Sequence, residues 1–265
     1  FRRSTTANPF PSQMGRVCPA PCQSGCNRNE VDDYVGINAV EQFIGDKAFK
    51  ENYKFDVAPK LLKERVAIIG GGPAGLSAAF QLRKMGYAST IFEERKELGG
   101  MMRYGIPGYR TPRDLLDKEI ERIINLGDIE VVTGKRVGKD LPLDDIEKSH
   151  DAVLWTIGCW NGKAIPVEGG DATNCITGVD FLEAFCDGRL KVGSKKVICV
   201  GGGDTSIDVV SVARRLGHIS KMNDQDTPEK MYETAGLDSS SIANKVEETL
   251  NSNIILAKNK NKISN

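Results

Sequence analysis

The pattern of apolar and polar residues changes in character near residue 65. Before it, prolines interrupt a polar stretch, and apolar residues at near-helical spacing predict one amphipathic helix over about 36–53. After it, short apolar runs alternate with helical patterns, which predicts an α/β fold with parallel sheets. Strand, glycine turn and helix occur twice in that order, so we expect two nucleotide-binding modules. Strands are expected at 66–69, 89–92, 129–132, 152–157, 197–200 and 253–257, and helices at 76–85, 113–125, 206–216 and 239–250.

The first glycine turn has the pattern G-x-G-x-x-G between a predicted strand and a predicted helix. Gly70 permits the tight turn, Gly72 allows a pyrophosphate to approach the backbone, and Gly75 allows the helix to pack closely on the strand. The helix start offers free N–H groups and a partial positive charge to that pyrophosphate. Glu93 ends the next strand, 23 residues after Gly70, and is suited to bind a ribose hydroxyl. The alternative is a tight turn without a ligand.

A second glycine-rich stretch, 98–107, follows this acidic residue. Paired glycines that include Gly100 allow the chain to run close to a second part of a long dinucleotide, which favours FAD over NAD at the first turn. Arg103 is interpreted either as a contact to phosphate or a flavin edge, or as one half of a surface salt bridge. Glu94 and Arg95 are interpreted as surface charges.

The second glycine turn, 201–206, has the weaker pattern G-x-G-x-x-S. Asp204 is interpreted as the N-cap of the following helix, a role compatible with ligand binding. Asp208 lies one helical turn further on, so we expect both carboxylates to face the loop.

The seven cysteines fall into two groups. Cys18, Cys22 and Cys26 lie within nine residues, and the prolines between them exclude a continuous helix, so the chain must turn as cluster-binding loops do. This pattern favours thiolate ligation over packing. Zinc is the competing metal, although no histidine or fourth cysteine stands nearby to complete its site. The scattered cysteines, Cys159, Cys175, Cys186 and Cys199, are interpreted as small buried residues.

Composition excludes several classes of function. The 36 basic and 36 acidic residues balance, so no net field attracts nucleic acid or an anionic membrane. The longest apolar-rich uncharged run, 66–80, is too short and too broken by glycine to span a bilayer. No signal peptide is visible, and an odd cysteine count with one tight cluster indicates a reducing compartment, so we expect a cytoplasmic location. Two histidines leave little room for a histidine-based triad or metal site.

Residues 14–217 resemble the family of the glutamate synthase small chain, which includes the N-terminal half of dihydropyrimidine dehydrogenase and the large subunit of bifurcating ferredoxin:NADP oxidoreductase. The motifs that carry the resemblance lie at 15–22, 66–107, 108–112, 156–158 and 201–208. It implies FAD at the first turn, NADH or NADPH at the second, 4Fe-4S clusters, and a protein subunit as electron acceptor or donor. The residues expected to bind the nucleotides are Gly70, Gly72, Pro73, Ala74, Gly75, Glu93, Gly100, Met101, Arg103, Val137, Thr156, Gly158, Gly201, Gly203, Asp204, Thr205 and Asp208.

The resemblance also implies how the metal ligands are divided. Cys18 and Cys22 match the ligands of one 4Fe-4S cluster, and Cys26 matches a ligand of the other. Glu41 matches a position where relatives supply a carboxylate or amide ligand, the alternative being an ordinary surface glutamate. Arg110 lies where the family carries a basic residue.

The sequence departs from the family pattern at both ends. The upstream run of cysteines and the C-terminal flavin segment are missing, so we expect a fragment of a longer protein with doubtful cofactor loading. Past Leu216 the match degrades. Lys258 and Lys260 follow the last predicted strand and are interpreted either as contacts to a 2′-phosphate or as a solvated tail, which leaves NADH and NADPH both open.

The expected organisation is a partial helical iron–sulfur domain at 1–58, the first segment of an FAD module at 59–190, and a truncated NAD(P) module at 191–265, inserted in the first. The implied activity passes a hydride from NAD(P)H to FAD, and then single electrons to the clusters and a partner. It requires no acid, base or nucleophile from a side chain. Two alternatives remain: a cluster-free FAD-dependent reductase, which needs a C-x-x-C that is absent, and a non-catalytic remnant that binds one nucleotide or none.

Overall fold

A computed structural model describes residues 1–58, 60–163, 166, 168–193 and 196–216 of the chain. It divides into two compact units. The first comprises Phe1–Gly162 with Cys186–Gly188, and the second comprises Lys163–Phe185 with Arg189–Asn265. No helix in the described part of the chain is long and apolar enough to cross a membrane.

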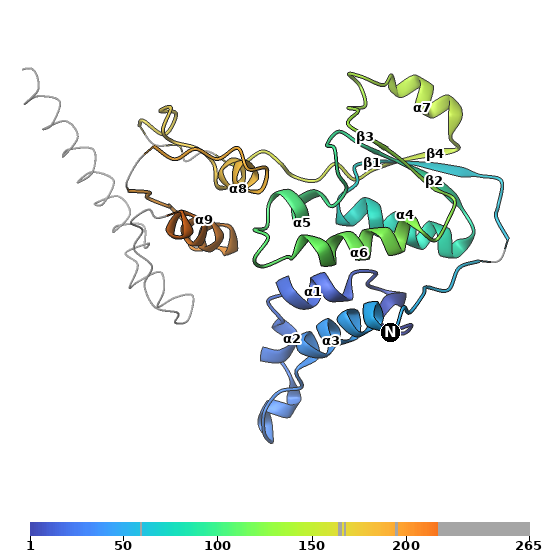
Figure 1. The fold of residues 1–265 in the computed structure, drawn as a ribbon, viewed down its shortest axis with the longest axis horizontal. Coiled ribbons are helices and arrows are strands. Elements are labelled where there is room, and N and C mark those ends of the chain that lie inside the picture. Colours follow the sequence, from blue (N-terminus) through green and yellow to red (C-terminus); the bar gives the residue numbers. More distant parts are fainter. Residues whose placement is uncertain (59, 164–165, 167, 194–195, 217–265) are drawn as a thin grey trace, which may run out of the picture. The chain divides into compact units, whose positions relative to one another are not determined.

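The first unit contains a parallel sheet of four strands in the order β3-β2-β1-β4 (Figure 1). Ile68 of β1 pairs with Ile91 of β2 and with Leu154 of β4, and β2 pairs in parallel with β3. The predicted parallel α/β fold is therefore confirmed for this unit. The strands are β1 (Arg65–Ile69), β2 (Ala88–Glu93), β3 (Ile129–Thr133) and β4 (Ala152–Trp155).

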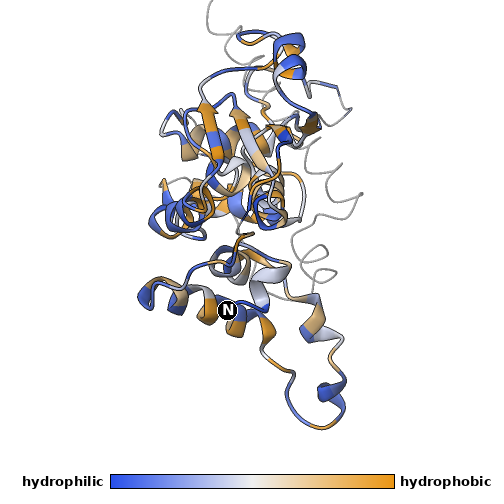
Figure 2. Ribbon diagram, turned by 90° about the vertical axis from the view of Figure 1, so that its right-hand side faces the viewer, coloured by the Kyte–Doolittle hydropathy of each residue, from blue (hydrophilic) through white to orange (hydrophobic). Residues whose placement is uncertain are grey.

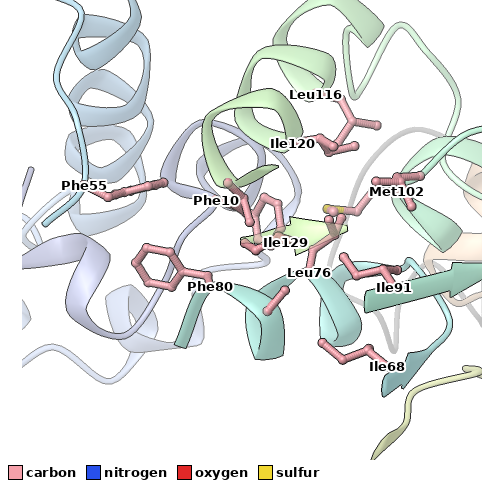
Figure 3. Close-up of a cluster of buried hydrophobic side chains, with 13 residues drawn as sticks. Phe10, Phe55, Ile68, Leu76, Phe80, Ile91, Met102, Leu116, Ile120 and Ile129 are labelled. Atoms are coloured by element: carbon pink, nitrogen blue, oxygen red, sulfur yellow. The ribbon is translucent and has the colours of Figure 1, made fainter. Parts of the chain in front are cut away.

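Helices α4 (Pro73–Met85) and α6 (Arg113–Ile124) cover one face of the sheet (Figure 1). Their apolar side chains meet Ile68 and Ile91 in the main core, drawn in Figure 3. The next residues along each strand point the other way, where Ile69 and Phe92 pack against α7 (Leu143–Ser149). Figure 2 shows that hydrophobic residues occur in both the strands and the helices, interspersed with hydrophilic ones.

The N-terminal region is helical, and it packs on α6 within the same unit. Phe10 and Phe55 of this region join the main core (Figure 3). Its elements are η1 (Ser4–Thr6), α1 (Pro11–Val17), α2 (Pro21–Ser24), η2 (Asn27–Glu30) and α3 (Ile37–Lys50), the last of which is the amphipathic helix predicted from the sequence.

Helices α1 and α3 pack in direct backbone contact because each presents a glycine to the other. A Cβ atom on Gly15 would lie 2.5 Å from the backbone nitrogen of Gln42, and one on Gly45 would collide with the backbone of Ser12. Larger side chains at either glycine would force the helices apart, so this pair fixes how α1 lies on α3.

In the second unit, α8 (Gly178–Cys186) and α9 (Asp204–Arg215) pack around Phe181, Leu182 and Val209. The strand predicted at 197–200 does not form. A strand needs a hydrogen-bonded neighbour, and the described residues form one sheet, in the first unit. The helix and strand predicted at 239–250 and 253–257, and Lys258 and Lys260, lie outside the described residues.

Candidate functional site

Glu93 lies against the first glycine turn. The side chain is 6% exposed at the end of β2, and its Oε2 accepts a hydrogen bond from the backbone N–H of Gly71 at 2.7 Å. Its Oε1 accepts a hydrogen bond from the backbone N–H of Arg95 at 2.9 Å. Both carboxyl oxygens are therefore fixed beside the turn, and each retains a lone pair for a further donor such as a ribose hydroxyl.

Two glycines of the turn are required by the fold. Gly70 has a φ of 111°, which disfavours any residue with a side chain. A Cβ atom on Gly75 would collide with the carbonyl oxygen of Gly70 and would lie 2.9 Å from Oγ1 of Thr156. These glycines therefore explain the tight turn and the close packing of α4 on β1 without any ligand.

Gly72 differs from Gly70 and Gly75 because the described fold does not require a glycine at this position. Its φ of −77° suits any residue, and an added Cβ would meet Gly100 at an ordinary contact distance of 3.6 Å. Gly72 is also the N-cap of α4, without a side-chain hydrogen bond to the helix start. The space beside it and the free N–H groups of the first turn of α4 fit a pyrophosphate, as a bound dinucleotide would require.

A short helix, α5 (Gly100–Tyr104), begins directly against this turn. The backbone N–H of Gly99 donates to the carbonyl oxygen of Gly71 at 2.9 Å. A Cβ on Gly100 would lie 2.6 Å from the Cα of Gly72, so only glycine permits this approach. The starts of α4 and α5 thus meet at Gly72. Of the other predicted residues here, Pro73 and Met101 are half-buried and Ala74 is exposed.

The end of β4 closes a third side of the turn. Thr156 follows β4, and its hydroxyl donates to the carbonyl oxygens of Gly70 at 2.8 Å and Ile69 at 3.0 Å. Gly158 has a φ of 71° and is exposed. Val137 is half-buried and packs with the cluster that contains Ile69. The carboxyl ends of β1, β2 and β4 meet at this edge, where open parallel sheets bind ligands.

Arg103 is engaged by the protein itself. The side chain is buried, its Nε donates to the carbonyl oxygen of Leu98 at 2.6 Å, and its guanidinium pairs with Asp117 and with Glu97. These contacts brace α5 against α6 and agree with the salt-bridge interpretation, except that the arginine is buried while the carboxylates of Asp117 and Glu97 stay exposed. A contact of Arg103 with phosphate or flavin stays a prediction. Arg110 is half-buried.

Arg95 is not the surface charge that the sequence indicates. Its guanidinium lies between two aromatic rings, 4.0 Å from the centroid of Trp160 and 4.7 Å from that of Tyr104. Burial raises the pKa of the Tyr104 hydroxyl, which hydrogen-bonds the backbone of Glu97 at 3.3 Å. We call Arg95, Tyr104 and Trp160 the aromatic clasp. It joins the segments after β2 and β4 to α5, and no local sequence pattern indicates it.

The cysteine segment turns as the prolines require. Helix α1 ends before Cys18, and Ala20 adopts a left-handed conformation with a φ of 53° before α2 begins. Cys18 Sγ accepts the backbone N–H of Ala20 at 3.4 Å. Backbone N–H groups of Val35 and Arg28 lower the pKa of the Cys26 thiol. Thiolate-accepting N–H groups of this kind suit cysteines that ligate a cluster.

The described residues contain no group of three or more histidine, cysteine or acidic side chains placed to hold a metal ion. Cys18, Cys22 and Cys26 thus do not converge on one centre, and their division between two clusters stays a prediction. Glu41 is half-buried on α3, where its Oε1 accepts a hydrogen bond from Asn8 at 2.7 Å.

The interpretation of the scattered cysteines as buried is wrong for two of them. Cys159 and Cys175 are exposed, whereas Cys186 and Cys199 are half-buried. Cys159 and Cys175 lie in segments without helix or strand, where loops run over the surface. Burial raises the pKa of the Cys199 thiol.

The second glycine turn has nearly the same backbone conformation as the first. Gly201 has a φ of 125° against 111° for Gly70, and Gly203 has a φ of −76° against −77° for Gly72. A Cβ on Gly203 would meet no atom within 4 Å, so the described fold does not require a glycine here either. Ser206 occupies the third glycine position.

The two aspartates of this turn differ from expectation. Gly203, and not Asp204, is the N-cap of α9, because the extended conformation that a cap requires falls at the glycine. Asp204 is the exposed first residue of the helix, whereas Asp208 is 4% exposed, so the two carboxylates do not share one environment. Thr205 is exposed.

Comparisons with known proteins agree with this geometry. Residues 64–261 match the family of pyridine nucleotide-disulphide oxidoreductases, and residues 1–53 match the 4Fe-4S cluster domain II of dihydropyrimidine dehydrogenase. The chain is 39% identical over 241 residues to NADPH-Fe(3+) oxidoreductase subunit beta of Geobacter sulfurreducens, covering 87% of this chain and 36% of the relative. It is 34% identical over 229 residues to the glutamate synthase (NADPH) small chain of Bacillus subtilis, covering 81% and 46%.

The chain thus spans less than half the length of these relatives. Among solved structures, FprA of Mycobacterium tuberculosis in complex with NADPH matches with a TM-score of 0.52 at 20% identity, over 56% of this chain and 36% of that one, which shows the fold alone. The resemblance to glutamate synthase small chains is confirmed. The chain belongs to the pyridine nucleotide-disulphide oxidoreductases, a family of NAD(P)H-dependent flavoprotein enzymes, and carries an N-terminal 4Fe-4S region of the dihydropyrimidine dehydrogenase type.

Proposed function

We propose that this chain is part of an NAD(P)H-dependent FAD and iron–sulfur oxidoreductase that exchanges electrons with a partner subunit. The observation that carries the proposal is the arrangement of Glu93 and Gly72 at the first turn. Glu93 is held beside the first turn, where we expect the ribose. The described fold does not require a glycine at position 72, so its missing side chain leaves room for a pyrophosphate. Both features serve a bound dinucleotide, and FAD is the one that the family supplies.

The second turn supports a nicotinamide nucleotide as the other ligand. Its backbone repeats the conformation of the first turn, including the N-cap glycine, which no contact within the described part of the chain requires. We assign NADH or NADPH to Gly201–Asp208, and we propose that the module from about residue 191 is inserted in the FAD module of 59–190. The helical region 1–58 is then the iron–sulfur domain.

The protein's part in this activity is to bind and to orient. Bound FAD supplies the conversion between a two-electron hydride and single electrons. The start of α4, with Gly100 beside it, would hold the pyrophosphate, and Glu93 would hold the ribose. The hydroxyl of Thr156 keeps the end of β4 against the turn. Cys18, Cys22 and Cys26 would present thiolates to 4Fe-4S clusters, and Glu41 is assigned as a further ligand. Because relatives are named as a subunit or a small chain, we assign a protein as the electron-exchanging partner.

The test compares alanine substitutions at Gly72, where we expect a loss of FAD affinity, and at Gly75, where we expect a loss of stability. In Gly72→Ala, we expect the thermal midpoint to stay unchanged and the affinity for FAD, measured by quenching of flavin fluorescence, to fall about tenfold or more, which corresponds to about 1.4 kcal/mol. In Gly75→Ala, the thermal midpoint itself falls because the new Cβ collides with Gly70. Gly108→Ala is the control, since a Cβ there meets no atom within 4 Å. Equal FAD affinity in Gly72→Ala and wild type contradicts the proposal.

A further inference from the structure

The aromatic clasp is joined through one residue to the carboxylate of Glu93. Arg95 provides the guanidinium that lies between the rings of Trp160 and Tyr104. The backbone N–H of the same arginine donates to Oε1 of Glu93 at 2.9 Å, while Oε2 accepts the N–H of Gly71 in the first glycine turn at 2.7 Å. One of the two hydrogen bonds that orient this carboxylate therefore comes from the residue that the clasp holds.

The backbone that carries this N–H group lies just beyond the end of a strand. Glu93 is the last residue of β2, and the segment from Glu94 to Gly99 forms neither helix nor strand. Within this segment, the carbonyl oxygen of Arg95 accepts the N–H of Gly134 at 2.8 Å. Ladder hydrogen bonds do not continue here, so the place of the Arg95 N–H depends on side-chain contacts as well as on this backbone contact.

Both rings of the clasp belong to segments that border the first turn. Tyr104 is buried at the end of α5, whose first residue, Gly100, lies directly against Gly72. Trp160 follows β4 and comes shortly after Thr156, whose hydroxyl holds the turn. The clasp therefore ties the segment after β2 to two elements that are themselves fixed against the turn. A carboxylate held in this way keeps its orientation before a ligand arrives, which favours binding.

We propose that Arg95 is a positioning residue for dinucleotide binding: held between Tyr104 and Trp160, it orients the carboxylate of Glu93 toward the adenosine ribose of FAD. The inference rests on the proposed function, because it requires FAD at the first turn. Stacking of a planar guanidinium on aromatic rings is favourable and directional, so its loss releases the segment that carries the N–H group. Arg95→Ala retains that N–H group, and a loss of affinity in this variant therefore reports the anchoring of the residue.

The first measurement is hydrogen exchange at the Arg95 amide, in the full chain without any cofactor. Trp160→Ala removes the ring that lies 4.0 Å from the guanidinium. We expect exchange to rise about tenfold or more, because the hydrogen bond to Glu93 opens more often. Trp160→Phe keeps an aromatic face and should restore most of the protection. Arg136→Ala, which removes an exposed cation paired with Glu94, is the matched control and should exchange like wild type. Unchanged exchange in Trp160→Ala overturns the inference.

The second measurement separates the orientation of Glu93 from a general effect on stability. FAD and its 2′,3′-dideoxyadenosine analogue, which lacks the ribose hydroxyls, are titrated by quenching of flavin fluorescence at a temperature where far-UV circular dichroism shows every variant folded. We expect Arg95→Ala and Trp160→Ala to bind FAD about tenfold more weakly than wild type, the loss expected when one hydrogen bond to a charged group is weakened. The analogue should bind wild type and both variants with nearly equal affinity. Arg95→Lys should recover part of the loss for FAD.

The outcomes distinguish the inference from the proposed function. Equal weakening for FAD and for the analogue would show that the clasp does not act through the ribose contact of Glu93, and it overturns the inference. Equal FAD affinity in the clasp variants and in wild type also overturns the inference, while the proposed function stands. A wild-type protein that binds no FAD overturns the proposed function, and the inference with it.

Discussion

The hydroxyl of Thr156 donates a hydrogen bond of 2.8 Å to the carbonyl oxygen of Gly70, and so ties the end of β4 to the first glycine turn. The backbone N–H of Thr156 donates to Ile69 at 2.8 Å, which continues the pairing of β4 with β1. One residue therefore both ends the strand pairing and holds the turn. Gly70 has no side chain of its own with which to fix the turn, so its conformation depends on such outside contacts.

Thr156→Val removes this hydroxyl and keeps the branched shape of the side chain. The loss of one intramolecular hydrogen bond should lower the free energy of unfolding by about 1 kcal/mol. A turn that is less well held should also bind FAD several-fold more weakly. Denaturant unfolding and FAD titration check the two effects. Thr133→Val, at the exposed end of β3, should change neither quantity.

The aromatic clasp predicts that Arg95, which the sequence indicates to be a surface charge, contributes to the stability of the fold. Arg95→Ala removes the cation between Tyr104 and Trp160, and we expect the free energy of unfolding to fall by about 1–2 kcal/mol. Arg95→Lys keeps the charge but not the planar group, so it should restore only part of the loss. Thermal unfolding in the presence and absence of FAD is the measurement.

Arg136→Ala is the control for the clasp. Arg136 pairs with Glu94 at 3.6 Å on the exposed surface, where such pairs contribute at most about 1 kcal/mol. If Arg95→Ala proves no more destabilising than Arg136→Ala, the clasp has no structural role.

The sequence predicts those parts of the site whose residues lie close to one another along the chain. The glycine turn, the acidic end of the next strand and the proline breaks around Cys18 each depend on residues close in the chain. The clasp and the hydrogen bonds between α1 and α6 depend on pairs such as Arg95 with Trp160 and Glu119 with Ser12, which no local period connects. A glutamate on an amphipathic helix is expected to face solvent, and the burial of Glu119 follows from the fold alone.

The strand predicted at 197–200 shows a second limit of prediction from the sequence: an apolar run does not by itself determine that a strand forms. The run is as apolar as that of β1, but a strand also requires a neighbour with which to pair. The glycine turn that follows keeps the same dihedral angles as the first turn, because these depend on Gly201 and on the helix start at Asp204. Local conformation was thus predictable here, and sheet membership was not.

Cysteine substitutions test whether iron binding depends on Cys18, Cys22 and Cys26 and not on the scattered cysteines. Replacing Cys18, Cys22 or Cys26 by alanine should lower the iron retained after reconstitution, because each removes a thiolate ligand. Cys159→Ala and Cys175→Ala remove exposed thiols outside the segment and should leave the iron content unchanged. Iron and acid-labile sulfide analysis makes the comparison. Equal iron loss in both groups would show that binding is adventitious.

The pH dependence of stability should report the buried carboxyl of Glu119. Burial raises its pKa from 4.5 to about 8 in the folded protein, against the opposing effects of the Ser12 and Gln13 N–H groups and of Arg122 and Arg16. Between these two values the folded protein holds a proton that the unfolded chain has released. The stabilisation is therefore complete below about pH 4.5 and is lost as the pH rises through 8. Within this window, unfolding free energy from denaturant titrations should fall by up to about 1.4 kcal/mol per pH unit. Glu119→Gln cannot ionise and should lose this slope, whereas Glu121→Gln should retain it; identical slopes in both variants would show that Glu119 does not titrate in this range.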